Sequence, residues 1–112
     1  MIKRIGILGG SGFVGHYIIQ ELLYEGYRVQ AINRSSIKGI NHNLFSQISI
    51  DLFSDNLFSL FKDIDCIIYN IGIIREFINK GISYKNLHED LASHVINSAE
   101  KAGVKKFILM SA

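Results

Sequence analysis

Glycines crowd the beginning of the chain in a pattern typical of a loop that binds phosphate. The stretch from Lys3 to Gly15 reads K-R-I-G-I-L-G-G-S-G-F-V-G, and its glycines satisfy both G-x-G-x-x-G and G-x-x-G-x-x-G. An apolar run over 5–8 precedes the glycines and an amphipathic segment follows them, as in a buried strand, a tight turn and a helix start. This context predicts a dinucleotide site, and a glycine-rich turn without a ligand is the alternative.

Each position of this stretch has a physical use in such a site. Gly9 or Gly10 lets the chain turn sharply out of the strand, and the missing side chain at Gly12 lets the backbone approach a pyrophosphate. Gly15 lets the helix pack closely against the sheet, and Ser11 could add a hydroxyl donor. The N–H groups that open the helix should point at the phosphates, helped by the helix dipole. These are the amides of Gly12, Phe13 and Val14.

The end of the second strand carries the choice between the two nicotinamide dinucleotides. An NAD(H) site needs an acidic residue about 20 residues after the glycines, to accept from the ribose 2′-hydroxyl. This chain has Asn33 there, followed by Arg34 and Ser35. No carboxylate would repel a 2′-phosphate, and Arg34 could clamp one, so NADP(H) is favoured over NAD(H). The alternative is that Arg34 is a solvated loop arginine.

Length and composition predict one small globular domain over residues 1–112. The hydrophobic content of 48% and the charged content of 20% are those of a soluble protein. A net charge of +2 without a basic run argues against a nucleic-acid partner. The single cysteine, Cys66, excludes an internal disulfide and is expected to fill the core.

The sequence also indicates where the protein is located in the cell. No segment has the apolar length needed to span a bilayer. The first strand begins almost at Met1, which leaves no room for a signal peptide, so a cytoplasmic location is expected. The four histidines and Cys66 do not form a metal-ligand pattern, so no metal site is expected.

Hydrophobic periodicity predicts that strands and helices alternate along the chain. The expected elements are strands over 5–8, 27–33, 48–52, 66–69 and 106–110, helices over 12–25 and 55–61 and through Leu87, Leu91, Val95 and Ala99, and loops over 34–44 and 73–83. Glycines at 26 and 103 are expected to cap two of the helices. Alternating elements with right-handed crossovers indicate a Rossmann-type, doubly wound α/β fold. It should have three α/β/α layers and a parallel sheet of order 3-2-1-4-5.

The chain ends at Ser111 and Ala112, directly after the fifth strand. Because a parallel sheet is buried on both faces, this class of fold normally continues with further strands and helices. We therefore expect either a fold truncated after the fifth strand, which is favoured, or an edge covered by another copy or a larger complex.

Several stretches together resemble the extended and atypical short-chain dehydrogenase/reductase superfamily, which includes the NAD-dependent epimerases and dehydratases. The resemblance is strongest to the branch that contains the nucleotide-binding accessory subunit of respiratory complex I. It is carried by G-G-S-G-F-V-G at 9–15, D-L at 51–52, N-I-G-I-I-R-E at 70–76, His88 in N-L-H-E-D, and A-E-K-A-G-V-K-K-F-I-L-M-S-A at 99–112. It covers the whole chain but only the N-terminal third or so of a family member.

The resemblance implies two further contact regions for the cofactor. Asp51 would bond the adenine amino group, and Leu52 would pack against the adenine ring. Asn70, Ile71 and Gly72 would line the ribose and nicotinamide side. The alternatives are that Asp51 is a turn or helix-start carboxylate and that Asn70 only caps a strand.

The resemblance also implies a catalytic Tyr-x-x-x-Lys pair, and this chain does not contain one. The residues four positions after its five tyrosines are Glu21, Arg28, Ala31, Ile73 and His88. Ser111 lies beside the position of the family's catalytic Ser or Thr. We therefore expect no catalytic residue within the chain and no catalysis by this piece alone.

Two functional hypotheses follow. The first is a dinucleotide-binding domain with a structural, assembly or sensing role and no chemistry of its own. The second is the cofactor half of an NAD(P)-dependent epimerase, dehydratase or reductase acting on sugar nucleotides or small carbonyl compounds. Whether the protein is an enzyme stays open at this point.

Overall fold

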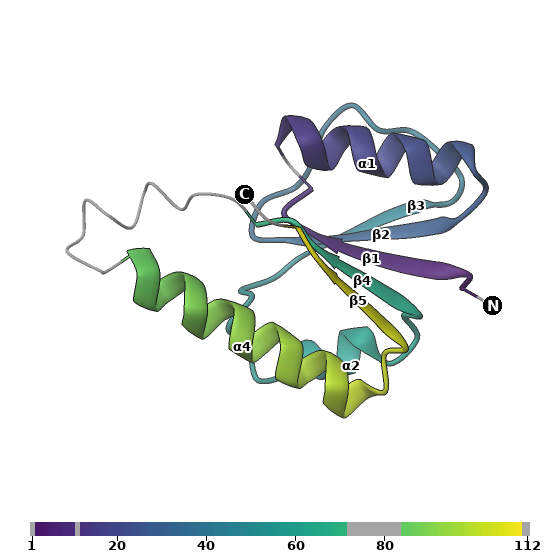
Figure 1. The fold of residues 1–112 in the computed structure, drawn as a ribbon. Helices are drawn as coiled ribbons and strands as arrows, with labels where there is room; N and C mark the ends of the chain where they lie inside the picture. Colours follow the sequence, from purple (N-terminus) through teal and green to yellow (C-terminus); the bar gives the residue numbers. More distant parts are fainter. Residues whose placement is uncertain (1, 11, 72–83, 111–112) are drawn as a thin grey trace.

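The computed structural model describes residues 2–10, 12–71 and 84–110 of the 112-residue chain. Strands and helices alternate, as the sequence predicts, except that a loop without a helix joins β2 to β3 (Figure 1). The elements are β1 (Arg4–Leu8), α1 (Phe13–Tyr24), β2 (Arg28–Asn33), β3 (Phe45–Ser49), α2 (Leu57–Phe61), β4 (Cys66–Tyr69), α4 (Tyr84–Ala102) and β5 (Lys106–Leu109). No helix within these ranges combines the length and the hydropathy required to cross a membrane.

The five strands form one parallel sheet of order β3-β2-β1-β4-β5. Helix α1 covers one face of this sheet, and α2 and α4 cover the other (Figure 1). The predicted doubly wound, three-layer α/β/α architecture is confirmed. Because β1 pairs with both β2 and β4, the chain changes the direction in which the sheet grows at β1. That switch point is where open α/β sheets bind ligands, at the carboxyl ends of their strands.

The core consists of two apolar clusters, one on each face of the sheet. Alternate residues of β1 enter different clusters: Ile5 and Ile7 pack towards α1, and Leu8 packs towards α2 and α4. In α4 the predicted four-residue repeat is confirmed for the buried residues Leu91, Val95 and Ala99. Burying a Val, Leu, Ile or Phe side chain fully stabilises the folded state by roughly 1.5–3 kcal/mol, so these clusters hold the helices on the sheet.

Helix α1 turns one narrow stripe of residues towards the sheet. Val14, in the first turn of the helix, does not belong to this stripe, and its side chain is 52% exposed. The buried stripe is Gly15, Ile19 and Leu23. Gly15 belongs to the stripe because the helix approaches the glycine turn so closely that only a residue without a side chain fits there.

Strand β3 begins three residues earlier than the predicted strand over 48–52. It pairs with β2 from Val29, beside Phe45, to Asn33, beside Ser49. Asp51 lies beyond it, where its Oδ1 atom accepts the N–H of Phe53 at 2.9 Å and closes a turn. The prediction was wrong because the apolar residues of 48–52 continue past the strand, whereas the edge strand itself is mostly polar.

The two predicted glycine caps are confirmed. Gly26 and Gly103 have φ angles of +91° and +80°, which L-residues with side chains rarely adopt. After α1, the N–H of Gly26 donates to the Leu23 carbonyl and the N–H of Tyr27 donates to the Leu22 carbonyl. These bonds satisfy carbonyl groups of the last helical turn and direct the chain into β2.

Asp65 ties the start of β1 to the start of β4. Its Oδ2 atom accepts the N–H groups of Lys3 and Arg4 at 2.9 and 3.0 Å. These two backbone hydrogen bonds hold the pKa of the Asp65 carboxyl below its ordinary value of 3.8, and the positive charge of Lys105 adds to the effect. The ionised carboxylate therefore stabilises the folded state.

We predict that Asp65→Asn lowers the stability at neutral pH and flattens the acid limb of the stability profile. A carboxyl whose pKa falls on folding contributes its full stabilisation above the unfolded value, and this is lost as pH falls through the folded value. Urea denaturation at pH 7 and at pH values below 3.8 measures the difference between the two proteins. A difference in stability between the two proteins that stays constant down to the lowest pH would contradict a lowered pKa of Asp65 in the folded state.

Candidate functional site

The predicted site residues lie where strands of the sheet end. The glycine turn follows β1, Asn33 ends β2, Asp51 follows β3, and Asn70 follows β4. Parallel strands bring their carboxyl ends to one edge of the sheet, so segments far apart in the sequence become neighbours there. Ser11 and Gly72 lie outside the residues that the structure describes.

The glycine turn is held by backbone geometry that tolerates no side chain at two positions. Gly9 has a φ angle of +82°, and a Cβ atom there would overlap the main chain of Asn70. A Cβ atom on Gly15 would lie 2.6 Å from both Gly10 Cα and Gly9 O. The expected roles of Gly9 in the turn and of Gly15 in close packing therefore match the geometry. Gly10 is buried against Ile19 of α1, and its Cβ would lie 2.8 Å from that side chain.

Asn33 has a role that the sequence analysis did not foresee. Its side chain is only 6% exposed. Its Oδ1 atom accepts the N–H of Gly9 at 3.0 Å and the N–H of Gly10 at 3.3 Å. The end of β2 thus fixes the turn that follows β1. The signal in the sequence was an amide residue at the end of a strand that neighbours β1.

Asn70 holds the turn from the other side. Its backbone N–H donates to Leu8 O at 2.8 Å, and its Nδ2 atom donates to Gly9 O at 3.3 Å. Gly9 is therefore bonded to residues of both strands that flank β1. The alternative that Asn70 caps a strand end is consistent with the first bond, and the second adds an anchor for the turn. Ile71 follows it, half-buried and packed against the α2 and α4 side of the core.

The opening of α1 is exposed and free of acidic groups. Gly12 is the N-cap residue, with extended backbone angles and no capping side chain, and the first helical turn contains no acidic residue. Among the residues that the structure describes, apart from Gly12 itself and its chain neighbours, none brings an atom within 4 Å of a Cβ built on Gly12. The side chain of Phe13 is 90% exposed. Helix starts leave N–H groups without intrahelical acceptors, so this end of α1 offers donors and a positive dipole end to an anion.

Arg34 and Ser35 are exposed immediately after Asn33. The loop that they begin is anchored from β3, because Gln47 accepts the N–H of Ile37 at 2.7 Å and donates to its carbonyl at 3.0 Å. The Ile37 side chain is buried in the cluster under α1. These contacts fix the path of the loop after β2. Arg34 therefore stays next to Asn33, which accepts hydrogen bonds from the glycine turn.

The turn that follows β3 is attached both to β2 and to α4. Ile50 donates its N–H to Asn33 O at 2.8 Å, and Asp51 is exposed next to it. The His94 Nε2 atom lies 2.8 Å from Ser54 O, and the His94 ring stacks on Phe53 at 6.2 Å between centroids. His94 is half-buried and attaches α4 to this turn. Leu52, beside Asp51, is half-buried against the apolar cluster of α2 and α4.

The described residues offer no competing metal or thiol chemistry. Within them, no group of three His, Cys, Asp or Glu side chains is placed to hold a metal ion. Cys66 is buried in β4, as expected of a core residue, and its burial raises the pKa of the thiol. A thiol with a raised pKa is a poor nucleophile at neutral pH.

The residues of this edge fit a dinucleotide. A diphosphate needs open space beside backbone donors, and Gly12 supplies that space at the start of a helix whose first turn has no acidic residue. The nucleoside on one side would meet the segments after β2 and β3, and the other nucleoside would meet the segment after β4. This arrangement matches the general placement of dinucleotides across the switch point of a doubly wound sheet.

Comparison with known proteins agrees with this geometry. Residues 9–112 match the model of a family described as NAD(P)H-binding. The human sterol-4-alpha-carboxylate 3-dehydrogenase, decarboxylating, is 28% identical over 110 residues, which are 97% of this chain and 29% of that protein. The chain thus spans less than a third of the length of this relative.

Solved structures show the same fold. A crystal structure of an oxidoreductase from Lactococcus lactis is 26% identical, with a TM-score of 0.76 over 97% of this chain and 48% of that one. An epimerase from Methanothermobacter thermautotrophicus has a TM-score of 0.83 at 19% identity, over 98% of this chain and 35% of that one.

Proposed function

This chain belongs to the NAD(P)H-binding family, and from that premise we propose that it binds NADP(H) through the amides that open α1. The observation that carries the proposal is the exposed, uncapped start of α1, where Gly12 leaves open space beside the backbone. In this proposal the N–H groups of Gly12, Phe13 and Val14 donate to the diphosphate, with Ser11 as a further donor. Gly9, Gly10 and Gly15 shape the turn and do not contact the cofactor with side chains.

The adenosine half lies in this proposal over the ends of β2 and β3. Arg34 and Ser35 bind the 2′-phosphate, since the guanidinium matches a phosphate and no carboxylate ends β2. Asp51 accepts from the adenine amino group, and Leu52 packs against the ring. The hydrogen bond from Phe53 to Asp51 supports this role, because it fixes the orientation of the carboxylate before the cofactor arrives.

The nicotinamide half lies in this proposal beside the segment that follows β4. Asn70, Ile71 and Gly72 line the ribose and the ring, and Asn70 is already fixed by its bond to Gly9. A bound nicotinamide supplies hydride transfer. The residues of this chain orient the cofactor and keep the turn in place.

We infer that residues 1–112 form one dinucleotide-binding unit without catalytic residues of its own. The resemblance of the sequence to the complex I accessory branch supports a structural, assembly or sensing role for the protein. In this reading another copy or a larger complex covers β5, whose Leu109 is 58% exposed.

The second candidate is the cofactor half of an NAD(P)-dependent epimerase, dehydratase or reductase. The names of the similar proteins, a dehydrogenase and an oxidoreductase, favour it. Sequencing the gene beyond Ala112 separates the two candidates. A Tyr-x-x-x-Lys pair about thirty residues further on, the spacing that the family resemblance implies, would decide for the enzyme.

We predict that Arg34→Ala weakens NADPH binding roughly tenfold and leaves NADH binding unchanged, because only NADPH carries the phosphate that the guanidinium binds. Isothermal titration calorimetry with each dinucleotide measures the two affinities. Lys38→Ala is the matched control, since it removes an exposed cation from the same loop. Equal losses for NADPH and NADH would contradict the role of Arg34 while leaving the diphosphate site intact.

A further inference from the structure

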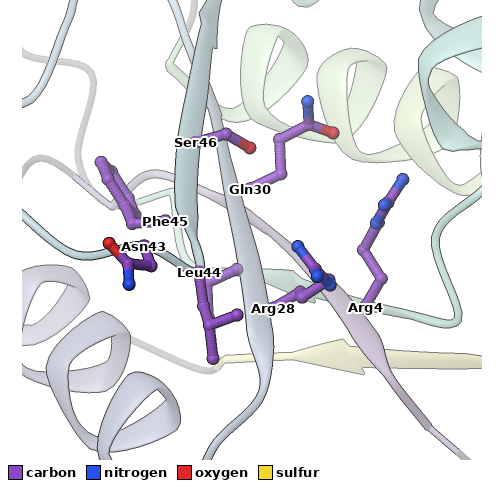
Figure 2. A pocket seen from close by; sticks show the side chains of 8 residues that line it. Arg4, Arg28, Gln30, Asn43, Leu44, Phe45 and Ser46 are labelled. Carbon is purple, nitrogen blue, oxygen red and sulfur yellow. The ribbon is translucent and has the colours of Figure 1, made fainter.

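A small polar depression lies at the amino-terminal ends of β1, β2 and β3, at the edge of the sheet opposite the glycine turn (Figure 2). Its volume is about 150 Å³, and its polar side chains include Arg4, Arg28, Gln30 and Ser46. Strand β1 runs from Arg4 at this edge to Leu8 before the glycine turn. Four residues of parallel strand span about 13 Å, so the depression is separate from the proposed dinucleotide site.

The strand register places these four side chains on one face. Arg4 is paired with Arg28, and Gln30 is paired with Ser46. Paired residues of neighbouring strands share a face, and residues two apart on one strand do as well. Figure 2 shows Arg28 and Gln30 extending from one side of β2, on the side where Arg4 extends from β1. The face thus gathers hydrogen-bond donors from three strands.

The same face is apolar and covered farther along the strands. Leu8 and Ile32 belong to the buried cluster under α2 and α4. A covered face of a parallel sheet is normally apolar along its whole length. The change to arginine and glutamine marks the place where the covering layer ends, and Arg28 is exposed there. The donors are therefore accessible to a ligand.

The charges at this edge are unbalanced within the chain. Like charges on directly paired positions of neighbouring strands repel each other. In residues 2–10, 12–71 and 84–110, neither Arg4 nor Arg28 forms an ion pair with a carboxylate. Asp65, which bonds to the backbone N–H of Arg4, uses the same carboxylate for the N–H of Lys3. A bound anion would balance the two guanidinium groups.

We propose that this depression binds a phosphate group, as inorganic phosphate or as a phosphate monoester. A guanidinium only donates hydrogen bonds, and its planar fork matches phosphate oxygens. A phosphate monoester carries a charge of about −1.5 to −2 at pH 7, which matches two arginines better than one carboxylate does. A cavity of about 150 Å³ holds a group the size of benzene, whereas sites for whole small molecules start at about 300 Å³, so a second dinucleotide does not fit.

Titration with inorganic phosphate at constant ionic strength, followed by the backbone amide resonances, tests the proposal. We expect saturable shifts of the amides of 28–30 and 44–46. Combining Arg4→Gln with Arg28→Gln should weaken the affinity that these amides report by about tenfold or more, while Lys38→Gln leaves it unchanged. Shifts confined to residues 9–15, or an equal response from the double variant, would overturn the proposal.

Two further ligands distinguish the source of the anion. Phenyl phosphate that binds at least as tightly as inorganic phosphate identifies a monoester, and weaker binding identifies the free ion. Glutarate that binds as well as either phosphate compound would point to an acidic side chain of a partner protein and overturn the proposal.

The unliganded protein gives an independent measurement. In phosphate-free buffer, Arg28→Gln is expected to raise the Tm by about 2–4 °C, because it relieves the repulsion between paired arginines. A lower Tm would show that Arg28 already has a stabilising partner, which contradicts the unbalanced charge on which the site depends.

Discussion

Replacing Gly9 with alanine is expected to lower the free energy of unfolding by about 2–5 kcal/mol and to abolish dinucleotide binding. The residue has a φ angle of +82°, and its Cβ atom would overlap the main chain of Asn70. A left-handed backbone costs an L-residue about 1–2 kcal/mol, and overpacking adds about 1–3 kcal/mol. Urea denaturation of the two proteins at 25 °C measures the loss.

Gly12→Ala is the matched control for this substitution. Gly12 has a φ angle of −82°, and within the described part of the chain no residue beyond its chain neighbours lies within 4 Å of its Cβ position. We expect its stability to stay within about 1 kcal/mol of wild type, the range of N-cap replacements, while NADPH affinity falls because the methyl group occupies the approach of the diphosphate. A stable Gly9→Ala protein, or a Gly12→Ala protein with full affinity, would contradict this account of the turn.

The second large effect is expected at Asn33. Asn33→Ala removes the acceptor of two backbone N–H groups, those of Gly9 and Gly10. Each unsatisfied buried donor costs about 1–3 kcal/mol, so the loss of the acceptor for two donors should lower the free energy of unfolding by about 2–6 kcal/mol. NADPH affinity should fall with it, because the turn that presents the amides of α1 loses its anchor. Urea denaturation and calorimetry measure the two effects.

Asn33→Asp separates the anchoring role from the choice of cofactor. A carboxylate oxygen can accept the same two N–H groups, and the Nδ2 atom that it replaces is buried without a hydrogen-bond partner within the described part of the chain. We therefore expect the aspartate variant to keep the turn but to bind NADH more tightly than NADPH, because its charge repels a 2′-phosphate. An aspartate variant that still prefers NADPH would show that the end of β2 does not govern the choice.

Much of the fold could be predicted from the sequence because its determinants are local. The repeat of Leu91, Val95 and Ala99 specifies one buried face of α4, and the glycines at 26 and 103 end two helices by their backbone freedom. The apolar runs of β1 and β4 are those of strands buried on both faces. With alternating elements and right-handed crossovers, few topologies remain.

The edge strand could not be located in the same way. β3 is at the edge of the sheet and pairs only with β2. This pairing determines where the strand begins and ends, and the side chains of β3 do not. Its sequence, Phe45 to Ser49, is mostly polar, and the apolar residues that suggested a strand continue into the turn at Asp51. Hydrogen bonding to a neighbouring strand is a long-range property that a local pattern does not report.

The candidate site also has parts that the local sequence predicts and parts that depend on long-range contacts. The glycine spacing predicts the turn and the helix start, because both are adjacent in the sequence. The anchoring of Gly9 by Asn33 and Asn70 joins residues 24 and 61 positions apart, and it depends on how their side chains meet at the strand ends, which no local pattern reports. Likewise, the clamp of His94 on Ser54 depends on how α4 packs beside the turn after β3.

The central claim is that the amides opening α1 receive the diphosphate of a nicotinamide dinucleotide. A crystal structure of the chain grown with NADPH tests it most directly. We predict diphosphate oxygens at about 2.7–3.2 Å from the backbone nitrogens of Gly12, Phe13 or Val14. A diphosphate bound elsewhere, or a side chain filling the space beside Gly12 with NADPH in excess, would contradict the claim.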